Sequence, residues 1–295
     1  MAPTESKALV LGGKNGLLGR ALVDELDSGG WSVFAAGSGD INFLSNNFSD
    51  ALKRLIDAEE PLVVFNAVGY TNVELAEEHE DEAMCLNRAV PAALGAISRT
   101  RPFRLVHYST DFVFDGRKST PYLTDDSTNP LSVYGRTKLA GEQALQSFDL
   151  PDCLIIRTAW LFGPYKKNFV RTILNICHEK RQATVVSDQL GSPTYTVDLA
   201  RHSLSLVEVG KGGIYHIVNS GQASWCELAD EAAKCVQFEC RITPVATEDF
   251  PHKANRPGYS VLDCSSFTQA TGITIRPWPQ ALREYLLHEL PGLDE

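Results

Sequence analysis

The chain has 295 residues, which is enough for one large domain or two closely packed ones with a sizeable core. Its formal net charge of -10 at pH 7 argues against nucleic acid or an anionic membrane as the main partner, although a local cluster of basic side chains could still bind an anionic small substrate. No apolar run approaches ~20 residues, and the polar residues 1–7 lead directly into a strand-like run, so we expect a cytoplasmic protein with neither a transmembrane segment nor a signal peptide.

The cysteines agree with that compartment. There are seven, an odd number, and they are scattered with no Cys-x-x-Cys pair. Reduced, mostly buried thiols are the state that we expect for such residues in a cytoplasmic protein. They lie at positions 85, 153, 177, 226, 235, 240 and 264.

A glycine-rich turn follows the first apolar run of the chain. Residues 7–11 read as a strand, and the spacing Gly13-x-x-Gly16-x-x-Gly19 comes directly after it, at the start of an amphipathic pattern. Glycines let a backbone turn tightly and approach a pyrophosphate, whose charge then meets the N-terminus of the following helix. Strand, glycine turn and helix in this order predict the opening of a dinucleotide-binding unit.

The second predicted strand, residues 31–36, ends in Ala-Gly-Ser and lacks the acid that NAD-binding units usually present to the adenosine ribose. This leaves room for a 2′-phosphate, and Lys14 in the glycine loop is a candidate partner for it. We therefore favour NADPH over NADH. The alternative is a solvated Lys14 and an enzyme that takes either cofactor. Asp40 and Ile41 come next and either flank the adenine or form a plain turn.

The third predicted strand, residues 62–67, is nearly continuous in apolar residues, as expected of a parallel strand covered on both faces. Residues 68–71 then lie at its C-terminal end, where such sheets bind ligands. From Glu74 to Glu82 there are six acids in nine residues. We interpret them as a solvated helix start and predict no metal site, because only His79 accompanies them. A helix is expected over 84–97.

A hydroxyl follows the fourth predicted strand, residues 103–108, at Thr110. The run 111–130 has no period, and a loop of this length usually covers a site. After it, Tyr134 and Lys138 stand one helical turn apart, so an ammonium would lie near a phenol and lower its pKa toward the working range. Thr110 could bond the same substrate oxygen that Tyr134 protonates.

Beyond the fifth predicted strand, 154–158, the pattern becomes mixed. We expect helices at 168–180, 197–207 and 224–236, and strands at 184–186 and 214–219. Four basic residues there could clamp a diphosphate, although each taken singly is more often a solvated surface charge. They are Lys166, Lys167, Arg171 and Arg256.

Together these elements predict an α/β fold: a Rossmann-type doubly wound parallel sheet with a smaller mixed α/β substrate-binding part. Residues 1–163 would mainly bind the dinucleotide and residues 164–295 mainly the substrate. Some segments of the second range, at about 183–210, would return to the Rossmann sheet.

The assembled motifs resemble the extended short-chain dehydrogenase/reductase family, and within it the dTDP-4-dehydrorhamnose reductases. The resemblance spans nearly the whole chain. It rests on the glycine loop and on the runs 66–76, 108–114, 134–142, 157–160, 188–194 and 256–257. The departures are modest: Val68 and Gly69 replace a pair of alanines, and Glu74 replaces an aspartate.

The resemblance implies NAD(P)H-dependent reduction of the C4 ketone of dTDP-4-dehydro-L-rhamnose to dTDP-L-rhamnose, a step of polysaccharide biosynthesis. Tyr134 would protonate the forming alkoxide, Lys138 would hold the nicotinamide ribose and lower the phenol's pKa, and Thr110 would bind the same oxygen. The expected cofactor residues are Gly13, Lys14, Asn15, Gly16, Leu17, Leu18, Gly19, Asp40, Ile41, Ala67, Val68, Gly69, Thr71, Tyr134 and Lys138. The expected substrate residues are Thr110, Asp111, Trp160, Asn168 and Arg256.

Other functions stay open. Another nucleotide-sugar reductase or an epimerase shares the fold, and a dehydratase is poorly supported because Asp111 is followed by Phe112 where that family has a second acid. A non-catalytic NADP-binding subunit, similar to the regulatory subunit of methionine adenosyltransferase, would retain much of the same pattern. A homodimer is a candidate assembly. Some members bind magnesium at a subunit contact, but we find no ligand set for it in this sequence.

Overall fold

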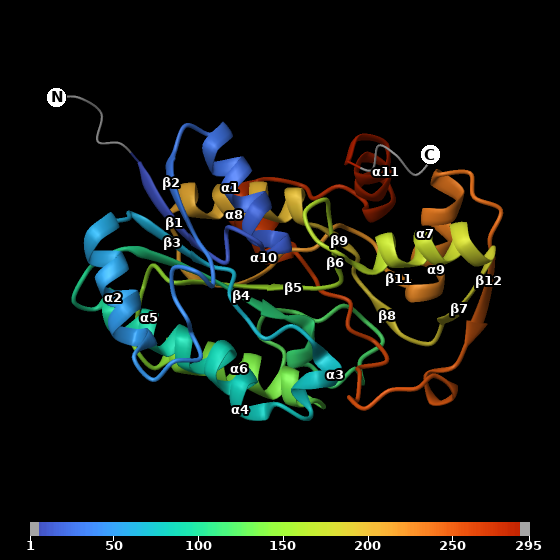
Figure 1. The fold of residues 1–295 in the computed structure, drawn as a ribbon, viewed down its shortest axis with the longest axis horizontal. Helices are drawn as coiled ribbons and strands as arrows, with labels where there is room; N and C mark the ends of the chain where they lie inside the picture. The colour runs from blue at the N-terminus through green and yellow to red at the C-terminus, as the bar shows by residue number, and fades with distance from the viewer. Residues whose placement is uncertain (1–5, 290–295) are drawn as a thin grey trace.

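The computed structural model describes residues 6–289, and residues 1–5, part of the polar start of the chain, lie outside this range. Its centre is a six-stranded parallel sheet in the order β10-β5-β4-β3-β1-β2 (Figure 1). The chain builds outward from β1 in both directions, which confirms the predicted doubly wound fold. The strands are β1 (Lys7–Leu11), β2 (Ser32–Ala36), β3 (Val63–Asn66), β4 (Arg104–Thr110), β5 (Leu154–Thr158) and β10 (Gly213–His216).

The central strands are almost entirely buried because helices cover both faces of the sheet. In β1, Ala8 and Val10 belong to one buried cluster, while Leu9 and Leu11 belong to another on the opposite face. This alternation follows from the period of two in a strand. Both faces are therefore closed to solvent at the centre.

Two groups of helices cover these faces (Figure 1). The residues of α1, α8 and α10 pack with Ala8 and Val10, whereas those of α2, α5 and α6 pack with Leu9 and Leu11. The first group is α1 (Leu17–Ser28), α8 (Thr196–Val209) and α10 (Ser265–Thr271). The second is α2 (Phe48–Glu59), α5 (Val90–Ser98) and α6 (Val133–Gln146).

The helix expected over 84–97 is interrupted. The chain forms α4 (Glu80–Met84), then a π-helical turn over Cys85–Ala89, and only then α5. A π turn inserts an extra residue into the helix and re-aims a side chain, here the fully buried Asn87.

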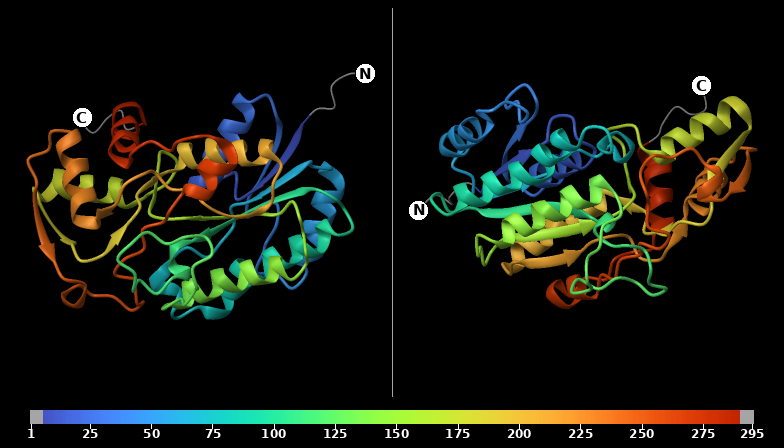
Figure 2. Two further views of the ribbon diagram at one scale, coloured as in Figure 1. Left: turned by 180° about the vertical axis from the view of Figure 1, so that it is seen from behind. Right: turned by 90° about the horizontal axis from the view of Figure 1, so that it is seen from below.

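The smaller part of the molecule lies at one end of the main sheet, and both views in Figure 2 show its helices gathered there. It contains α7 (Phe169–Lys180), α9 (Trp225–Cys235) and α11 (Trp278–Glu289). Three short strand pairs accompany them: β7 (Gln182–Val186) with β12 (Arg241–Val245), β6 (Leu161–Phe162) with β9 (Thr194–Tyr195), and β8 (Leu190–Gly191) with β11 (Ala223–Ser224). Other short elements are α3 (Val73–Ala76) and the 3₁₀ turns Asp111–Val113 and Thr247–Asp249.

The segment at 183–210 divides between the two parts. Its strand β7 pairs with β12 away from the main sheet, whereas α8 packs against the sheet and the next strand, β10, pairs with β5. Residues late in the chain thus complete the sheet that the first residues begin.

One disulfide corrects the expectation that all thiols are reduced. Cys177, buried in the last turn of α7, is bonded to Cys240 just before β12. The two residues are 63 positions apart, and only the packing of α7 against the β7 and β12 pair brings them together. Across residues 6–289, no helix has the length and apolar character needed to cross a membrane.

Candidate active site

The glycine loop between β1 and α1 has no room for a side chain at Gly16 or Gly19. A Cβ on Gly16 or Gly19 would lie 2.5 or 2.1 Å from the carbonyl oxygen of Gly12, and Gly12 itself has a φ of +83°. Helix α1 begins at Leu17 with no side-chain cap and no acid in its first turn. The bare backbone and uncapped N–H groups form a cradle suited to a phosphate.

The expected adenosine end holds an ion pair. Lys14 Nζ lies 2.8 Å from a carboxylate oxygen of Asp40, and the other oxygen accepts a hydrogen bond from Gly37 N at 2.7 Å. The bond from Lys14, with the Gly37 amide, lowers the pKa of Asp40. Lys14 is half exposed but is paired, so a 2′-phosphate would have to share it with Asp40. Ile41 beside them is buried.

The stretch after β3 is held by Asn87, which the sequence did not single out as a site residue. Its amide accepts a hydrogen bond from Tyr70 N at 2.8 Å and donates to Tyr70 O at 3.2 Å and to Thr137 Oγ1 on α6 at 2.9 Å. Ala67, Val68, Gly69 and Thr71 belong to this stretch. A polar residue inside a predicted apolar helix was the signal for this role.

Tyr134 lies in the first turn of α6, against the end of β4. Ser132 caps the helix by accepting a hydrogen bond from Gly135 N at 3.1 Å. Gly135 packs on the 3₁₀ turn after β4, since its Cβ would lie 2.3 Å from Phe112 O. This approach brings Tyr134 within reach of the Thr110 hydroxyl, which interacts with its phenol. Lys138 is 5% exposed, and its ammonium donates to Tyr108 O.

Burial dominates the protonation of this cluster. It raises the pKa of Tyr134 to about 12, aided by the Asp111 carboxylate and opposed by the Thr110 hydroxyl. Burial also lowers the pKa of Lys138 to about 8, which the Glu142 carboxylate opposes. The expected lowering of the phenol's pKa by Lys138 is therefore wrong for this arrangement, because burial raises this pKa and the Lys138 ammonium is directed at Tyr108 O.

Asp111 is 2% exposed and accepts a hydrogen bond from Thr110 Oγ1 at 3.0 Å. Burial raises the pKa of this carboxyl to about 6, opposed by hydrogen bonds that include those of Ser260 and Thr110. Thr110, Asp111, Tyr134 and Lys138 thus lie together at the C-terminal end of β4.

The expected substrate residues lie in different settings. Trp160, at a φ of +47°, stacks on Trp225. Asn168 caps α7 by accepting from Arg171 N and donates to Gly163 O at 2.8 Å, so its amide supports the local backbone. Arg256 Nη2 lies 2.5 Å from Glu74 on α3.

This geometry can be compared with known proteins. Residues 7–290 match the model of the family described as RmlD substrate binding domain. The chain belongs to this family.

Curated relatives in the family are similar over nearly the whole chain. The spore coat polysaccharide biosynthesis protein SpsK of Bacillus subtilis is 38% identical and covers 98% of this chain and 100% of its own. The dTDP-4-keto-6-deoxy-D-glucose reductase of Streptomyces niveus is 36% identical, covering 92% and 94%. The dTDP-4-dehydrorhamnose reductase of Aggregatibacter actinomycetemcomitans is 36% identical, covering 93% and 97%. The chain is thus a member of a family of dTDP-sugar reductases.

A solved structure supports the same placement. The dTDP-4-dehydrorhamnose reductase of Bacillus anthracis, in complex with NADP, is 29% identical with a TM-score of 0.91, covering 96% of this chain and 99% of its own.

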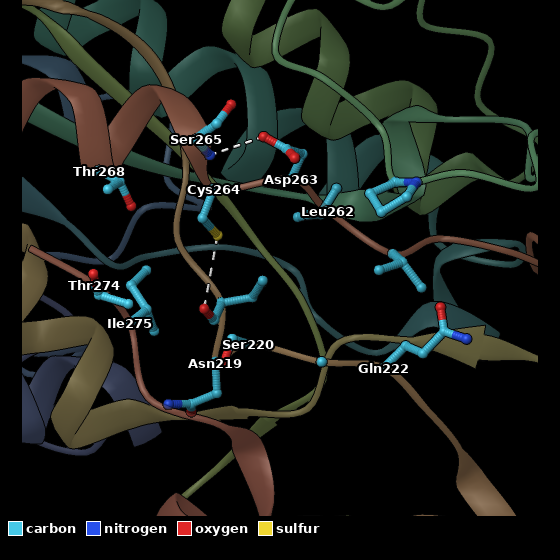
Figure 3. A pocket seen from close by; sticks show the side chains of 14 residues that line it. Asn219, Ser220, Gln222, Leu262, Asp263, Cys264, Ser265, Thr268, Thr274 and Ile275 are labelled. Carbon is cyan, nitrogen blue, oxygen red and sulfur yellow. Dashed lines mark hydrogen bonds between the residues drawn. The ribbon is translucent and has the colours of Figure 1, made fainter.

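The structure also contains a pocket of about 330 Å³ that is separate from the expected catalytic, cofactor and substrate residues. Residues 218–222 and 261–265 form most of its wall, and none of the expected site residues lines it (Figure 3). Polar groups in the wall bond to the protein: Asp263 accepts from Ser265 N, and the thiol of Cys264 donates to Val218 O.

Proposed function

We propose that the protein reduces the C4 ketone of dTDP-4-dehydro-L-rhamnose to dTDP-L-rhamnose with NADPH, and that Tyr134 is the proton donor. The observation that carries the proposal is the cluster of Tyr134, Thr110 and Lys138 at the edge of the sheet that also bears the glycine loop. Two named relatives that reduce dTDP-linked keto sugars support the substrate class.

The chain fits a dinucleotide at the glycine loop. The cradle at Gly12, Gly16 and Gly19 is closed to any Cβ, so the loop can approach a pyrophosphate at the start of α1. When bound, the reduced nicotinamide supplies the hydride for the ketone carbon. NADP in the Bacillus anthracis relative favours NADPH, and Lys14 would turn toward its 2′-phosphate in competition with Asp40.

The high pKa of Tyr134 suits a donor. With a pKa of about 12, the phenol keeps its proton at neutral pH and can give it to the more basic alkoxide that forms from the ketone. The Thr110 hydroxyl orients the same oxygen. Lys138 contributes positive charge near the cofactor ribose, and with a pKa of about 8 it loses this charge as the pH rises above 8.

The two parts of the molecule would bind different ligands. Residues 1–163 would mainly hold the dinucleotide, and residues 164–295, with α8 and β10 completing the main sheet, would mainly hold the sugar nucleotide. The Arg256 guanidinium is a candidate partner of the substrate diphosphate. A related dTDP-4-keto sugar is the second candidate substrate, since the Streptomyces niveus relative is named for one.

The test is oxidation of NADPH and NADH by the purified protein with dTDP-4-dehydro-L-rhamnose and with dTDP-4-keto-6-deoxy-D-glucose. Tyr134→Phe should lower kcat by about 10²- to 10⁴-fold with NADPH affinity retained, because general acid catalysis contributes on that order. Tyr215→Phe, a buried tyrosine on β10, is the matched control and should keep wild-type kcat. Unchanged turnover by Tyr134→Phe would rule out Tyr134 as the proton donor.

A further inference from the structure

Two indole rings stand face to face where the two parts of the molecule meet. The ring centroids of Trp160 and Trp225 are 3.6 Å apart and the planes differ by 5°. Trp160 packs both on the buried cluster around Phe114 and on the cluster of the smaller part. Its φ of +47° is rare for a bulky residue, and the unfavourable backbone conformation must be offset by favourable contacts of the side chain. Backbone strain of this kind persists only where surrounding contacts stabilise it, and it is common at functional sites.

The short strand pair β8 and β11 builds this arrangement. Ala223 pairs with Gly191, and Ser224 pairs with Leu190. A Cβ on Gly191 would lie 2.4 Å from the Trp160 ring, so the indole rests against bare backbone. Trp225 is the first residue of α9, whose start is fixed by a capping box between Ser224 and Glu227. Trp160 therefore rests on the backbone of β8 and on the first residue of a capped helix.

A chain of hydrogen bonds locks the second indole. Trp225 Nε1 donates to Gln189 Oε1 at 3.2 Å, Gln189 Nε2 donates to Thr247 Oγ1 at 2.9 Å, and Thr247 Oγ1 donates to Asp188 at 2.6 Å. Gln189 is 5% exposed, so its amide has little choice of partners. Phe169 packs on Trp225 at a tilt, with centroids 4.6 Å apart. The Trp225 ring is thus held at its nitrogen by Gln189 and packed against Phe169 and Trp160.

The same network reaches the segment that carries Arg256. Thr247 begins the 3₁₀ turn of this segment, and Leu190 N donates to Gly258 O at 2.8 Å. Trp225 and Gln189 therefore connect Trp160 with the segment 247–258.

We propose that Trp225 is a positioning residue for the sugar-nucleotide site, which holds the Trp160 indole in the one orientation that contacts the substrate sugar. This role rests on the proposed function. Stacked aromatic rings attract each other beyond their buried area, and a preformed indole costs less ordering on binding than a mobile one. Removal of Trp225 should therefore weaken substrate binding and leave cofactor binding unchanged.

The experiment compares Trp225→Leu and Trp225→Phe with the wild type. For Trp225→Leu we expect KM for the sugar nucleotide to rise about three- to tenfold, the range that loss of one aromatic pair allows, with kcat and KM for NADPH unchanged. Trp225→Phe should recover most of the affinity because it restores a stacking ring. Trp31→Phe is the matched control, because this indole packs on the cluster around Ala8 and Val10 and not on Trp160. It should leave kcat and both KM values unchanged.

Two readouts separate this proposal from the reaction itself. The near-ultraviolet circular dichroism of coupled indoles should be lost in both Trp225 variants and kept in Trp31→Phe. Calorimetric affinity for dTDP-L-rhamnose should fall in Trp225→Leu without any turnover being measured. Unchanged affinity despite loss of the dichroism signal would overturn the positioning role, as would an equal loss of NADPH affinity. Absence of wild-type turnover with sugar-nucleotide binding intact would contradict the proposed reaction alone.

Discussion

Asp111, Tyr134 and Lys138 show how burial decides protonation at single residues. Each lies at the C-terminal edge of the sheet, and burial shifts each pKa in the direction that favours the neutral form of the side chain. It raises the pKa of Asp111 to about 6 and that of Tyr134 to about 12, and it lowers the pKa of Lys138 to about 8. From the Tyr-x-x-x-Lys spacing alone, the attraction between ammonium and phenolate seemed decisive. Desolvation has the largest effect on the Tyr134 pKa, and the ammonium donates its hydrogen bond to Tyr108 O.

Asp111 should make stability depend on pH. Its folded pKa of about 6 lies above the ordinary 3.8, so the folded state binds this proton more tightly. The resulting stabilisation is complete below pH 3.8 and is lost as the pH rises to 6, in total about 3 kcal/mol. Relative to Asp111→Asn, which does not titrate, the wild type should lose free energy of unfolding over this window.

Urea denaturation of both proteins between pH 4 and pH 7 measures this difference. The wild type should lose stability against the variant as the pH rises. A difference that stays constant across the window would show that Asp111 keeps its ordinary pKa.

At the scale of elements, α6 is held in place from several sides, which fixes Tyr134 and Lys138 as a unit. A Cβ on Gly141 would lie 2.1 Å from Asn87 O, so the helix touches the π turn directly. One turn after Lys138, Glu142 forms a two-pronged ion pair with Arg157 of β5, at 3.0 and 2.7 Å. The two side chains are 1% and 4% exposed.

Arg157 also connects the loop 111–130 to this helix. Its third nitrogen donates to Thr124 O at 3.2 Å, and its guanidinium lies over the Phe114 ring. Arg157→Met should therefore lower the free energy of unfolding by about 3–5 kcal/mol, because it leaves the buried Glu142 carboxylate without a partner. The double variant with Glu142→Leu should recover much of this loss.

Chemical denaturation of the wild type, the two single variants and the double variant gives the free energies of unfolding for a double-mutant cycle. Lys53→Met, which breaks the exposed pair with Asp57 on α2, is the control and should cause no measurable loss. Additive effects of Arg157→Met and Glu142→Leu would contradict the coupling.

At the scale of the whole molecule, α3 fastens the segment 250–258 of the smaller part to the dinucleotide side (Figure 1). Glu74 pairs with Arg256 and accepts hydrogen bonds from Lys253 N at 2.6 Å and Ala254 N at 3.3 Å. Glu78 pairs with the Lys253 ammonium. The pKa of Glu74 is lowered by these bonds, against the effect of burial. These contacts join residues that are about 180 positions apart.

Glu74→Gln should raise KM for the sugar nucleotide about three- to tenfold with kcat unchanged, because the segment that presents Arg256 would no longer be held by a charged partner. Steady-state kinetics measures the effect. Glu80→Gln, an exposed acid on α4, is the control and should behave as the wild type. A lower KM in Glu74→Gln would instead show that Glu74 competes with the substrate for Arg256.

Much of the fold was readable from the sequence. The strands at 7–11 and 154–158 lie where the apolar runs predicted them, and the glycine spacing marked a turn in which Gly16 and Gly19 have no room for a Cβ. Such features depend on residues that are neighbours in the chain. Local periodicity and backbone conformation, which nearby residues determine, were sufficient for them.

Contacts between distant residues were decided only by the tertiary structure. The Cys177 to Cys240 bond, the hydrogen bonds of Asn87, the Glu74 to Arg256 pair and the stacking of Trp225 on Trp160 each join different elements. The shifted pKa values of Tyr134 and Lys138 belong to the same class, because burial is a property of the packed molecule. The sequence by itself determined which groups could react and along which strands and helices they lie. Packing determined which of them meet and in which charge state, since desolvation and pairing energies exist only once distant elements exclude water from each other.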